Sequence, residues 1–199
     1  MTRLTGKIIL ITGTPCVGKT SVSKRLAAKL GALHIDLAEL VKKEKLYSEI
    51  DIERDSIIAD LDKVSQRIKE IIQEAKNDVI IDGHYAVHVV ASDTVNVVFV
   101  LRKDPRKLKV LMEERGYSSK KLWENLEAEI LDVCLSEAVE ICGRSKVCEI
   151  DATDKSVDEV IDEILGIIQG KRKCVIGIVD WLGKLEQEGV LDYFLKNLP

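Results

Sequence analysis

The sequence predicts an α/β fold in which a five-stranded parallel sheet carries helices on both faces. Short β-branched or apolar runs alternate along the chain with longer segments of helical periodicity, which is the pattern of strand–helix–strand units. The predicted strands span residues 7–12, 32–36, 78–82, 95–102 and 146–151. The chain has 199 residues and is 46% hydrophobic, so it can bury one substantial core.

The predicted helices lie between and after these strands. They span 19–30, 61–76, 105–115, 120 to about 142, and a segment that begins after a Ser156 cap. In the first two, Ile, Val and Leu recur at the three- and four-residue spacing of a helix that faces the core. Pro105 suits the first turn of the third helix, and Gly116 suits the position just after its end. Together these elements predict one domain over residues 1–170.

The pattern changes after Gly170. The basic run 171–173 has the composition of a linker, and residues 171–199 as a whole are expected to form a helical extension with an apolar face. That face consists of Trp181, Leu182, Leu185, Val190, Leu191, Phe194 and Leu195. A free apolar surface of this size is unusual on a monomer. We therefore expect the extension to pack on the same domain rather than to form a groove for a partner.

Charge and cysteine content narrow the setting of the protein. A formal net charge of −4 argues against a surface that binds DNA directly. The 5 cysteines, at positions 16, 134, 142, 148 and 174, lack the paired spacing of a zinc site, and we expect them all to be reduced thiols. No apolar stretch approaches the length of a membrane span, which indicates a cytoplasmic protein without a membrane contact.

A phosphate-binding signature lies within residues 11–21, whose sequence is ITGTPCVGKTS. The motif G-x-x-x-x-G-K-[ST] is satisfied by Gly13, Gly18, Lys19 and Thr20. In such a loop, backbone N–H groups and the positive end of a helix surround phosphate oxygens, the lysine neutralises charge, and the hydroxyl binds Mg²⁺. The alternative is a chance glycine-rich turn, which the predicted strand before the motif and the predicted helix after it disfavour.

The predicted strand 78–82 ends in an acidic residue that fits the same site. Asp82 follows a buried apolar run, and a carboxylate at the tip of such a strand can hold Mg²⁺ through water. The alternative is an ordinary turn, because Asp-Gly is a common turn pair. His84, two residues further on, could orient a water or a phosphate oxygen, or it could simply pack in the loop.

The acceptor of a transferred phosphate must be sought in other segments. Residues 34–64 follow the second predicted strand, where a small kinase places the arm that closes over its acceptor. Residues 101–130 lie where a lid would bring arginine to the donor phosphates. The sequence contains no N-K-x-D motif for reading guanine. The pattern therefore favours a kinase over a GTPase.

Several motifs resemble, in the same order, those of one family. They are GTPCVGKT (13–20), DLAELVKKEKLY (36–47), ERDSIIADLDKV (53–64), VIIDGH (79–84), LR (101–102) and RGYSSKKLWENLEAEI (115–130). From Lys7 to about Gln169 the chain resembles the adenylate kinase isoenzyme six family in its archaeal form. Members of that family are small nuclear-type adenylate kinases and ATPases that also serve as ribosome-assembly factors.

The resemblance implies a P-loop nucleoside monophosphate kinase fold that transfers the γ-phosphoryl group of Mg²⁺-bound ATP to AMP and also has ATPase activity. It implies an acceptor arm at about 37–60 and a lid at about 114–124. The implied ATP-binding residues are Gly13, Cys16, Val17, Gly18, Lys19, Thr20, Ser21 and Arg115. The implied AMP-binding residues are Asp36, Leu37, Lys42, Arg54 and His84. The implied catalytic residues are Lys19, Asp82, His84 and Arg115, with Mg²⁺ held by Thr20 and, through water, by Asp82.

The resemblance also leaves a second function open. The family's D-x-H feature, which is tied to its ATPase and assembly role, falls on Asp82 and His84. An assembly ATPase would bind a small-subunit ribosomal protein and release it on hydrolysis, acting in ribosome biogenesis and rRNA processing, with kinase activity secondary. The acidic balance of the chain suits a basic partner of this kind.

Some candidate residues have structural interpretations as well. Arg115, which a glycine follows, is a phosphate-binding lid residue, a helix C-terminus, or both. For Arg54 and Arg102, a structural ion pair is as good an explanation as a phosphate contact. Glu127 and Glu129 fit a solvated or ion-paired helix face.

The chain departs from the family pattern at two positions. Cys16 occupies a place in the loop where relatives have glycine, and Leu111 occupies a place before the lid where they often have arginine. If the φ angle of Cys16 is positive, the strain is about 1 kcal/mol or more. A phosphate contact needs only the backbone amide of that residue. We therefore expect a working loop with cysteine in place.

Overall fold

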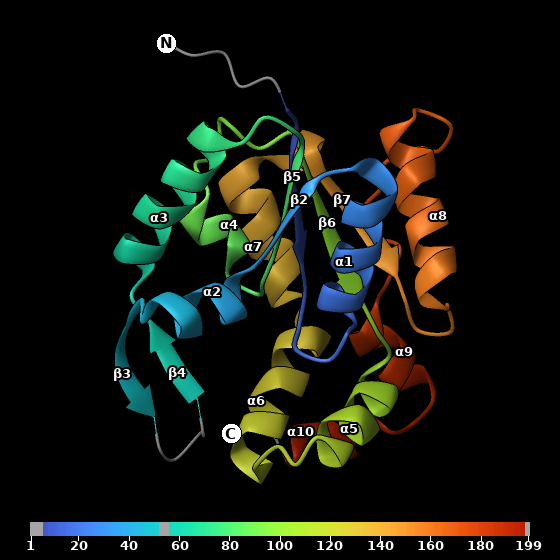
Figure 1. The fold of residues 1–199 in the computed structure, drawn as a ribbon. Helices are drawn as coiled ribbons and strands as arrows, with labels where there is room; N and C mark the ends of the chain where they lie inside the picture. The colour runs from blue at the N-terminus through green and yellow to red at the C-terminus, as the bar shows by residue number, and fades with distance from the viewer. Residues whose placement is uncertain (1–5, 52–55, 198–199) are drawn as a thin grey trace.

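A five-stranded parallel sheet forms the centre of the computed structural model, which describes residues 6–51 and 56–197 (Figure 1). The strands lie in the order β2-β5-β1-β6-β7, and each neighbouring pair is parallel. Their bounds are β1 Ile8–Thr12, β2 Leu33–Asp36, β5 Val79–Asp82, β6 Val97–Arg102 and β7 Val147–Asp151. The predicted α/β class and the predicted strands are confirmed.

Helices cover both faces of this sheet. They are α1 Lys19–Leu30, α2 Leu37–Glu44, α3 Leu61–Glu74, α4 Ala86–Val89, α5 Pro105–Glu114, α6 Ser119–Ile130, α7 Val133–Cys142, α8 Val157–Ile168, α9 Trp181–Gln187 and α10 Leu191–Leu195. One hydrophobic core joins the sheet to α1, α5, α6, α8, α9 and α10, and a second joins it to α2, α3, α4 and α7. In β1, for example, Ile9 and Ile11 belong to the first core while Ile8 and Leu10 belong to the second, because successive side chains of a strand alternate between faces.

The predicted helix from 120 to about 142 is wrong, because α6 and α7 are separate. Asp132, between them, has a left-handed backbone with φ 57°, which an α-helix cannot contain. Its carboxylate accepts a hydrogen bond from the guanidinium of Arg102. The break thus turns the acidic side chain toward a buried cation, which periodicity along the helix does not reveal.

The proposed acceptor arm contains a hairpin that the sequence pattern did not predict. After α2, strands β3 Tyr47–Asp51 and β4 Ser56–Ala59 pair in an antiparallel ribbon. The hairpin projects beyond the carboxyl ends of the sheet strands, as do α5 and α6 (Figure 1). Arg54, one of the expected AMP-binding residues, lies outside the described residues.

The expectation that all cysteines are reduced is wrong for two of them. Cys148 of β7 and Cys174 form a disulfide. The segment after residue 173 runs beside β7, where Glu149 N donates to Val175 O across 2.8 Å. This pairing across 26 residues of sequence depends on tertiary structure and has no local signature. Cys16, Cys134 and Cys142 are free thiols.

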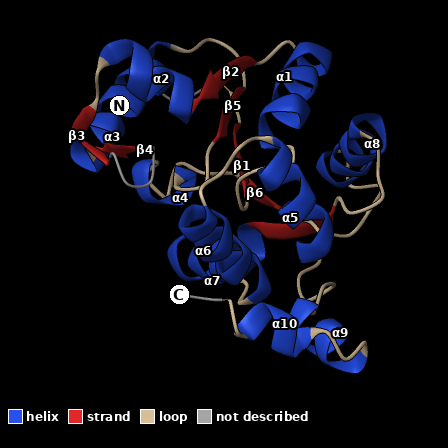
Figure 2. Ribbon diagram, turned by 90° about the horizontal axis from the view of Figure 1, so that it is seen from below, coloured by secondary structure: helices blue, strands red, loops and turns tan. Residues whose placement is uncertain are grey.

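The C-terminal helices pack on the first core. Leu185 and Phe194 are buried in that core, and Trp181 is buried as well, while Leu182 and Leu195 remain 41% and 48% exposed. The ring of Trp123 in α6 makes an edge contact with Phe194, at 6.1 Å between centroids. Viewed from below, α9 and α10 lie at one side of the molecule, and the β3–β4 hairpin lies at the other (Figure 2). Within the described ranges, no helix is both long enough and apolar enough to cross a bilayer.

Candidate active site

The loop between β1 and α1 needs glycine at two points. Gly13 has φ 134°, and a Cβ there would lie 2.3 Å from the carbonyl oxygen of Leu101 in β6, so a side chain has no room. Gly18 has φ 107° and is the N-cap residue of α1, a conformation that L side chains rarely adopt. The free N–H groups of the first turn of α1 therefore face the loop, where an anion would be stabilised.

Lys19 folds back over this loop. Its Nζ donates to Gly13 O at 2.8 Å and to Thr14 O at 2.9 Å. Burial of the ammonium lowers the pKa of Lys19, although the electrostatic attraction of nearby groups, Asp82 among them, acts to raise it. The cation is thus held at the mouth of the loop by two carbonyl oxygens, which a phosphate can replace as acceptors.

Three acidic and polar side chains meet at the carboxyl ends of β2 and β5. Thr20 Oγ1 lies 3.1 Å from both Asp36 Oδ2 and Asp82 Oδ1. Asp36 and Asp82 are register partners in the sheet, which explains why their carboxylates converge on one hydroxyl. The other oxygen of Asp36 accepts from the N–H groups of Ala38 and Glu39 and caps α2. These oxygen atoms form the donor set that a hard cation prefers.

His34 completes this cluster, and the sequence analysis missed it. Its Nε2 lies 2.6 Å from Asp82 Oδ2, and Asp82 itself is only 2% exposed. His34 precedes Asp36 by two residues in β2, so both side chains lie on one face of the strand. The two-residue spacing of His34 and Asp36 in a predicted strand was the sequence signal that could have identified His34 as part of the site.

His84 lies beside the cluster rather than inside it. Its carbonyl oxygen accepts from Thr12 Oγ1 at 3.1 Å, and its ring meets Tyr85 edge-on at 4.7 Å. Desolvation of the charged ring lowers the pKa of His84 to about 4, and repulsion from Lys19 adds to the shift. The imidazole is therefore neutral at pH 7, although part of the residue is open to solvent.

Arg115 reaches the phosphate loop from the end of α5. It is the C-cap residue of that helix, and its Nη1 donates to Cys16 Sγ across 3.3 Å. Cys16 has φ 71°, so the left-handed conformation on which the strain at this position depends is present. Tyr117 also lies against Cys16, and burial raises the pKa of its phenol to about 12. Cysteine, arginine and tyrosine together join the lid segment to the loop.

Four other predicted residues differ in their surroundings. Val17 is buried in the first core, and Ser21 is exposed in the first turn of α1. Leu37 is fully buried in the second core, so only its backbone could meet a nucleotide. Lys42 is exposed in the last turn of α2.

Two residues that the sequence left as structural possibilities form a buried network behind the loop. Arg102 Nε donates to Glu129 Oε1 at 2.9 Å, and Glu129 Oε2 accepts from Thr14 Oγ1 at 2.6 Å. Arg102 is therefore a structural ion-pair residue and not a phosphate ligand. Glu129 is ion-paired, as expected, but buried instead of solvated.

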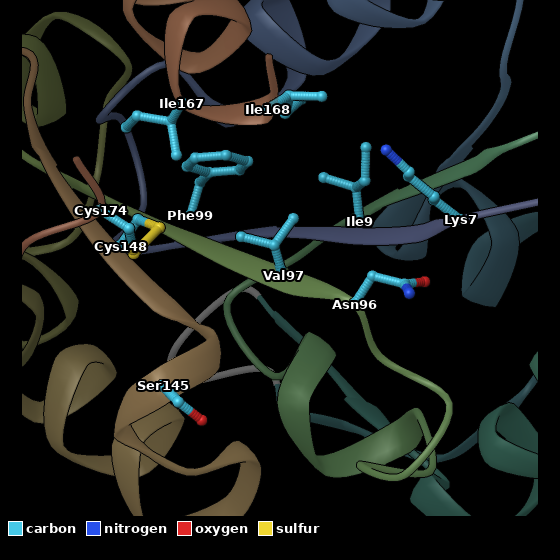
Figure 3. A pocket seen from close by; sticks show the side chains of 10 residues that line it. All are labelled: Lys7, Ile9, Asn96, Val97, Phe99, Ser145, Cys148, Ile167, Ile168 and Cys174. Carbon is cyan, nitrogen blue, oxygen red and sulfur yellow. A yellow bond between two sulfur atoms is a disulfide. The ribbon is translucent and has the colours of Figure 1, made fainter. Parts of the chain in front are cut away.

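A cavity of about 240 Å³ lies far from these groups (Figure 3). It opens at the amino ends of β1, β6 and β7, beside the last turn of α8, and the Cys148–Cys174 disulfide lines one wall. The candidate site lies at the opposite, carboxyl edge of the same strands. Crevices at the carboxyl edge are where open α/β sheets bind ligands.

A glycine-rich loop at a helix N-terminus, a half-buried lysine, and a hydroxyl between strand-end carboxylates define a P-loop protein of the kinase class. Solved kinases share the fold. The shikimate kinase from Acinetobacter baumannii, in complex with shikimate, aligns with a TM-score of 0.58 and 18% identity over 85% of this chain and 96% of that one. The thymidylate kinase from Candida albicans aligns with a TM-score of 0.53 and 16% identity, over 83% and 92%. At these identities the likeness concerns the fold alone.

Sequence relatives narrow the class further. A family model described as an AAA domain matches residues 9–132. A protein of Methanocaldococcus jannaschii described as "Putative adenylate kinase" is 45% identical over 176 residues, which are 88% of this chain and 93% of that protein. A protein of Thermococcus onnurineus with the same description is 38% identical over 188 residues, 94% of this chain and 97% of that protein. The chain belongs to this family of adenylate kinase-like proteins.

Proposed function

We propose that the protein is an adenylate kinase that transfers the γ-phosphoryl group of ATP to AMP, with ATPase activity when water takes the place of the acceptor. The proposal is supported chiefly by the convergence of Lys19, Thr20 and Arg115 on one loop, between an arm that suits an acceptor and a lid segment. The descriptions of the relatives agree with it. The resemblance to the adenylate kinase isoenzyme six family adds AMP as the acceptor.

Phosphoryl transfer requires positioning and charge neutralisation more than a strong base. Lys19 Nζ would exchange the Gly13 and Thr14 carbonyl oxygens for oxygens of the donor phosphates. Arg115 already lies at the loop through Cys16, and its guanidinium would meet the transferring group there. The β3–β4 hairpin and α2 would hold AMP for in-line attack.

The residues present fit a magnesium ion. Thr20 Oγ1 lies 3.1 Å from a carboxylate oxygen of Asp36 and 3.1 Å from one of Asp82, and all three groups are the oxygen donors that Mg²⁺ prefers. Thr20 would hold the ion directly, and Asp82 would hold it through water. When bound, the ion would neutralise charge on the phosphates. His34, at 2.6 Å from Asp82, orients that carboxylate.

A coupled assay of ADP formation tests the proposal. We expect the rate with ATP plus AMP to exceed the rate with ATP alone by at least tenfold, roughly one effective interaction of 1.4 kcal/mol. Replacing AMP by CMP, UMP, dTMP or shikimate gives the acceptor preference, and Lys19→Met should abolish all of these rates. A rate that AMP does not raise would overturn the kinase assignment, while hydrolysis that survives would retain the ATPase.

A second function, an ATPase that assists ribosome assembly, is supported by one observation. His84, the last residue of the D-x-H feature, is neutral at pH 7 and exposed, so a partner could reach its side chain, whereas Asp82 is buried. Such a protein would bind a basic small-subunit ribosomal protein and release it on hydrolysis. Copurification at moderate salt, with and without ATP, tests this function. A partner that is never retained by the nucleotide-free protein would argue against it.

A further inference from the structure

A single buried carboxylate connects the phosphate loop to the C-terminal segment. Glu129 is 1% exposed, and its Oε2 accepts from Thr14 Oγ1 at 2.6 Å. Its Oε1 accepts from Trp181 Nε1 at 2.9 Å. Two further donors reach Oε1 from the end of β6 and the residue after it, Arg102 Nε at 2.9 Å and Lys103 N at 3.1 Å. Both oxygens of this carboxylate thus accept hydrogen bonds, which fixes its orientation.

A second buried carboxylate makes the same link. Glu149 Oε1 accepts from Arg102 Nη1 at 2.8 Å, and its Oε2 accepts from Gly177 N at 2.7 Å and Ile178 N at 2.9 Å. One guanidinium therefore faces the carboxylates of Glu129 and Glu149, as well as Asp132. The N–H groups of the C-terminal segment supply the remaining hydrogen bonds, without which the buried charges would be costly.

The C-terminal segment 174–197, which we call the C-terminal brace, is fixed at several points. Cys174 is bonded to Cys148, and Lys184 Nζ donates to Asp104 Oδ2 at 3.2 Å, just before α5. Phe194 packs against Trp123 in α6. The brace therefore contacts the N-cap residue of α5 and, through Trp123, the part of α6 that belongs to the lid segment. It meets Glu129 through Trp181.

The position of Thr14 matters to the nucleotide site. Its hydroxyl is held by Glu129, and its carbonyl oxygen is one of the two acceptors of Lys19 Nζ. Thr14 is 1% exposed, so the hydroxyl has no water to replace a lost partner. A displacement of this backbone would move both the lysine and the loop amides, and displacements of about 1 Å can cost 100-fold in a positioned reaction.

We propose that the C-terminal brace positions the phosphate loop through Trp181, Glu129 and Thr14, so that these three are positioning residues for nucleotide binding. The proposal rests on the proposed function only in assuming that the loop binds ATP. In this arrangement the extension does more than cover the core, because it sets the direction of the carboxylate that holds the loop.

The test uses the full-length protein and the affinity for Mg²⁺-ATP, measured by isothermal titration calorimetry. Trp181→Phe keeps an aromatic ring and removes the N–H donor, and Thr14→Val keeps the shape and removes the hydroxyl. We expect each to raise the Kd about five- to tenfold. The double variant should have a Kd no higher than that of the single variant with the larger effect, since both substitutions break one relay. Thr14→Ser, which restores the hydroxyl, should return the Kd to within about twofold of the wild-type value.

Phe194→Leu is the matched control for stability. Phe194 is buried in the same brace but donates nothing to Glu129, so this variant should lower the melting temperature while leaving the Kd within about twofold. Two results would overturn the proposal: normal binding by both Trp181→Phe and Thr14→Val, or equal weakening by Phe194→Leu. A wild-type protein that binds no ATP would instead overturn the proposed function itself, together with this inference.

Discussion

Cys16 and Arg115, 99 residues apart in sequence, meet at the phosphate loop, where the guanidinium donates a hydrogen bond to the sulfur across 3.3 Å. The backbone of Cys16, with φ 71°, would favour glycine at this position. The contact with Arg115 gives the cysteine side chain a role that this conformation does not predict. The thiol thus offers Arg115 a weak acceptor. A weak acceptor holds the guanidinium near the loop and releases it readily.

Cys16→Gly tests how much the thiol contributes. Glycine removes a left-handed strain of about 1 kcal/mol and leaves the backbone amide in place, so we expect the Kd for ATP to stay within about threefold of wild type or to tighten. Cys16→Ala is the matched control, since it loses the sulfur and keeps the strain. Chemical unfolding should place the glycine variant above the alanine variant by about 1 kcal/mol. A tenfold loss of ATP affinity in both would mean that the sulfur itself matters for binding.

Asp82→Asn should reduce ADP formation from ATP and AMP by roughly 100-fold. The amide cannot neutralise a cation, and it disturbs both Thr20 and His34, which contact the carboxylate. Initial rates at saturating Mg²⁺ and both nucleotides measure the effect. Asp78→Asn is the control, because Asp78 precedes the same strand at its other end and its carboxylate accepts from Lys7 N at 2.7 Å. Wild-type rates of ADP formation for both variants would show that the reaction does not require the Asp82 carboxylate.

Most of the fold could be predicted from the sequence because its signals are local. Strand β1 is an unbroken apolar run before a glycine, and α8 begins at Ser156 with a full capping box. The break at Asp132 and the Cys148–Cys174 bond could not be predicted in the same way. Both depend on a neighbour distant in sequence, the first on Arg102 and the second on the course of the chain beside β7.

The residues of the candidate site also fall into those with local sequence signals and those that depend on distant contacts. The loop residues follow from a motif whose spacing is fixed by a turn, and Asp82 follows from the end of its strand. Glu129 could not be recognised, because a glutamate on an amphipathic helix is usually solvated, and its burial depends on Thr14, Arg102 and Trp181 from three other parts of the chain.

The stability of the protein should fall between pH 6.5 and about 4 in part because of His84. Desolvation and repulsion from Lys19 lower the pKa of this imidazole to about 4 in the folded state, whereas the unfolded chain titrates near 6.5. In that window the unfolded state binds more protons, so the free energy of unfolding decreases as the pH falls. Urea unfolding from pH 8 to 4 should show a shallower decrease for His84→Gln, with the same difference from wild type at all pH values above 7. Parallel curves across the whole range would contradict the shift.

Reduction should destabilise the protein through the Cys148–Cys174 bond. The bond closes a loop of 26 residues, for which chain entropy in the unfolded state predicts a contribution of about 3 kcal/mol. Urea unfolding with and without a phosphine reductant measures it, and Cys174→Ala is the control, since the reductant should not change its midpoint. We choose Cys174 because Cys148 is buried in the first core, where truncation would add a cavity. A wild-type midpoint that reductant leaves unchanged, with all cysteines titrating as free thiols in the native protein, would show that the bond does not form in solution.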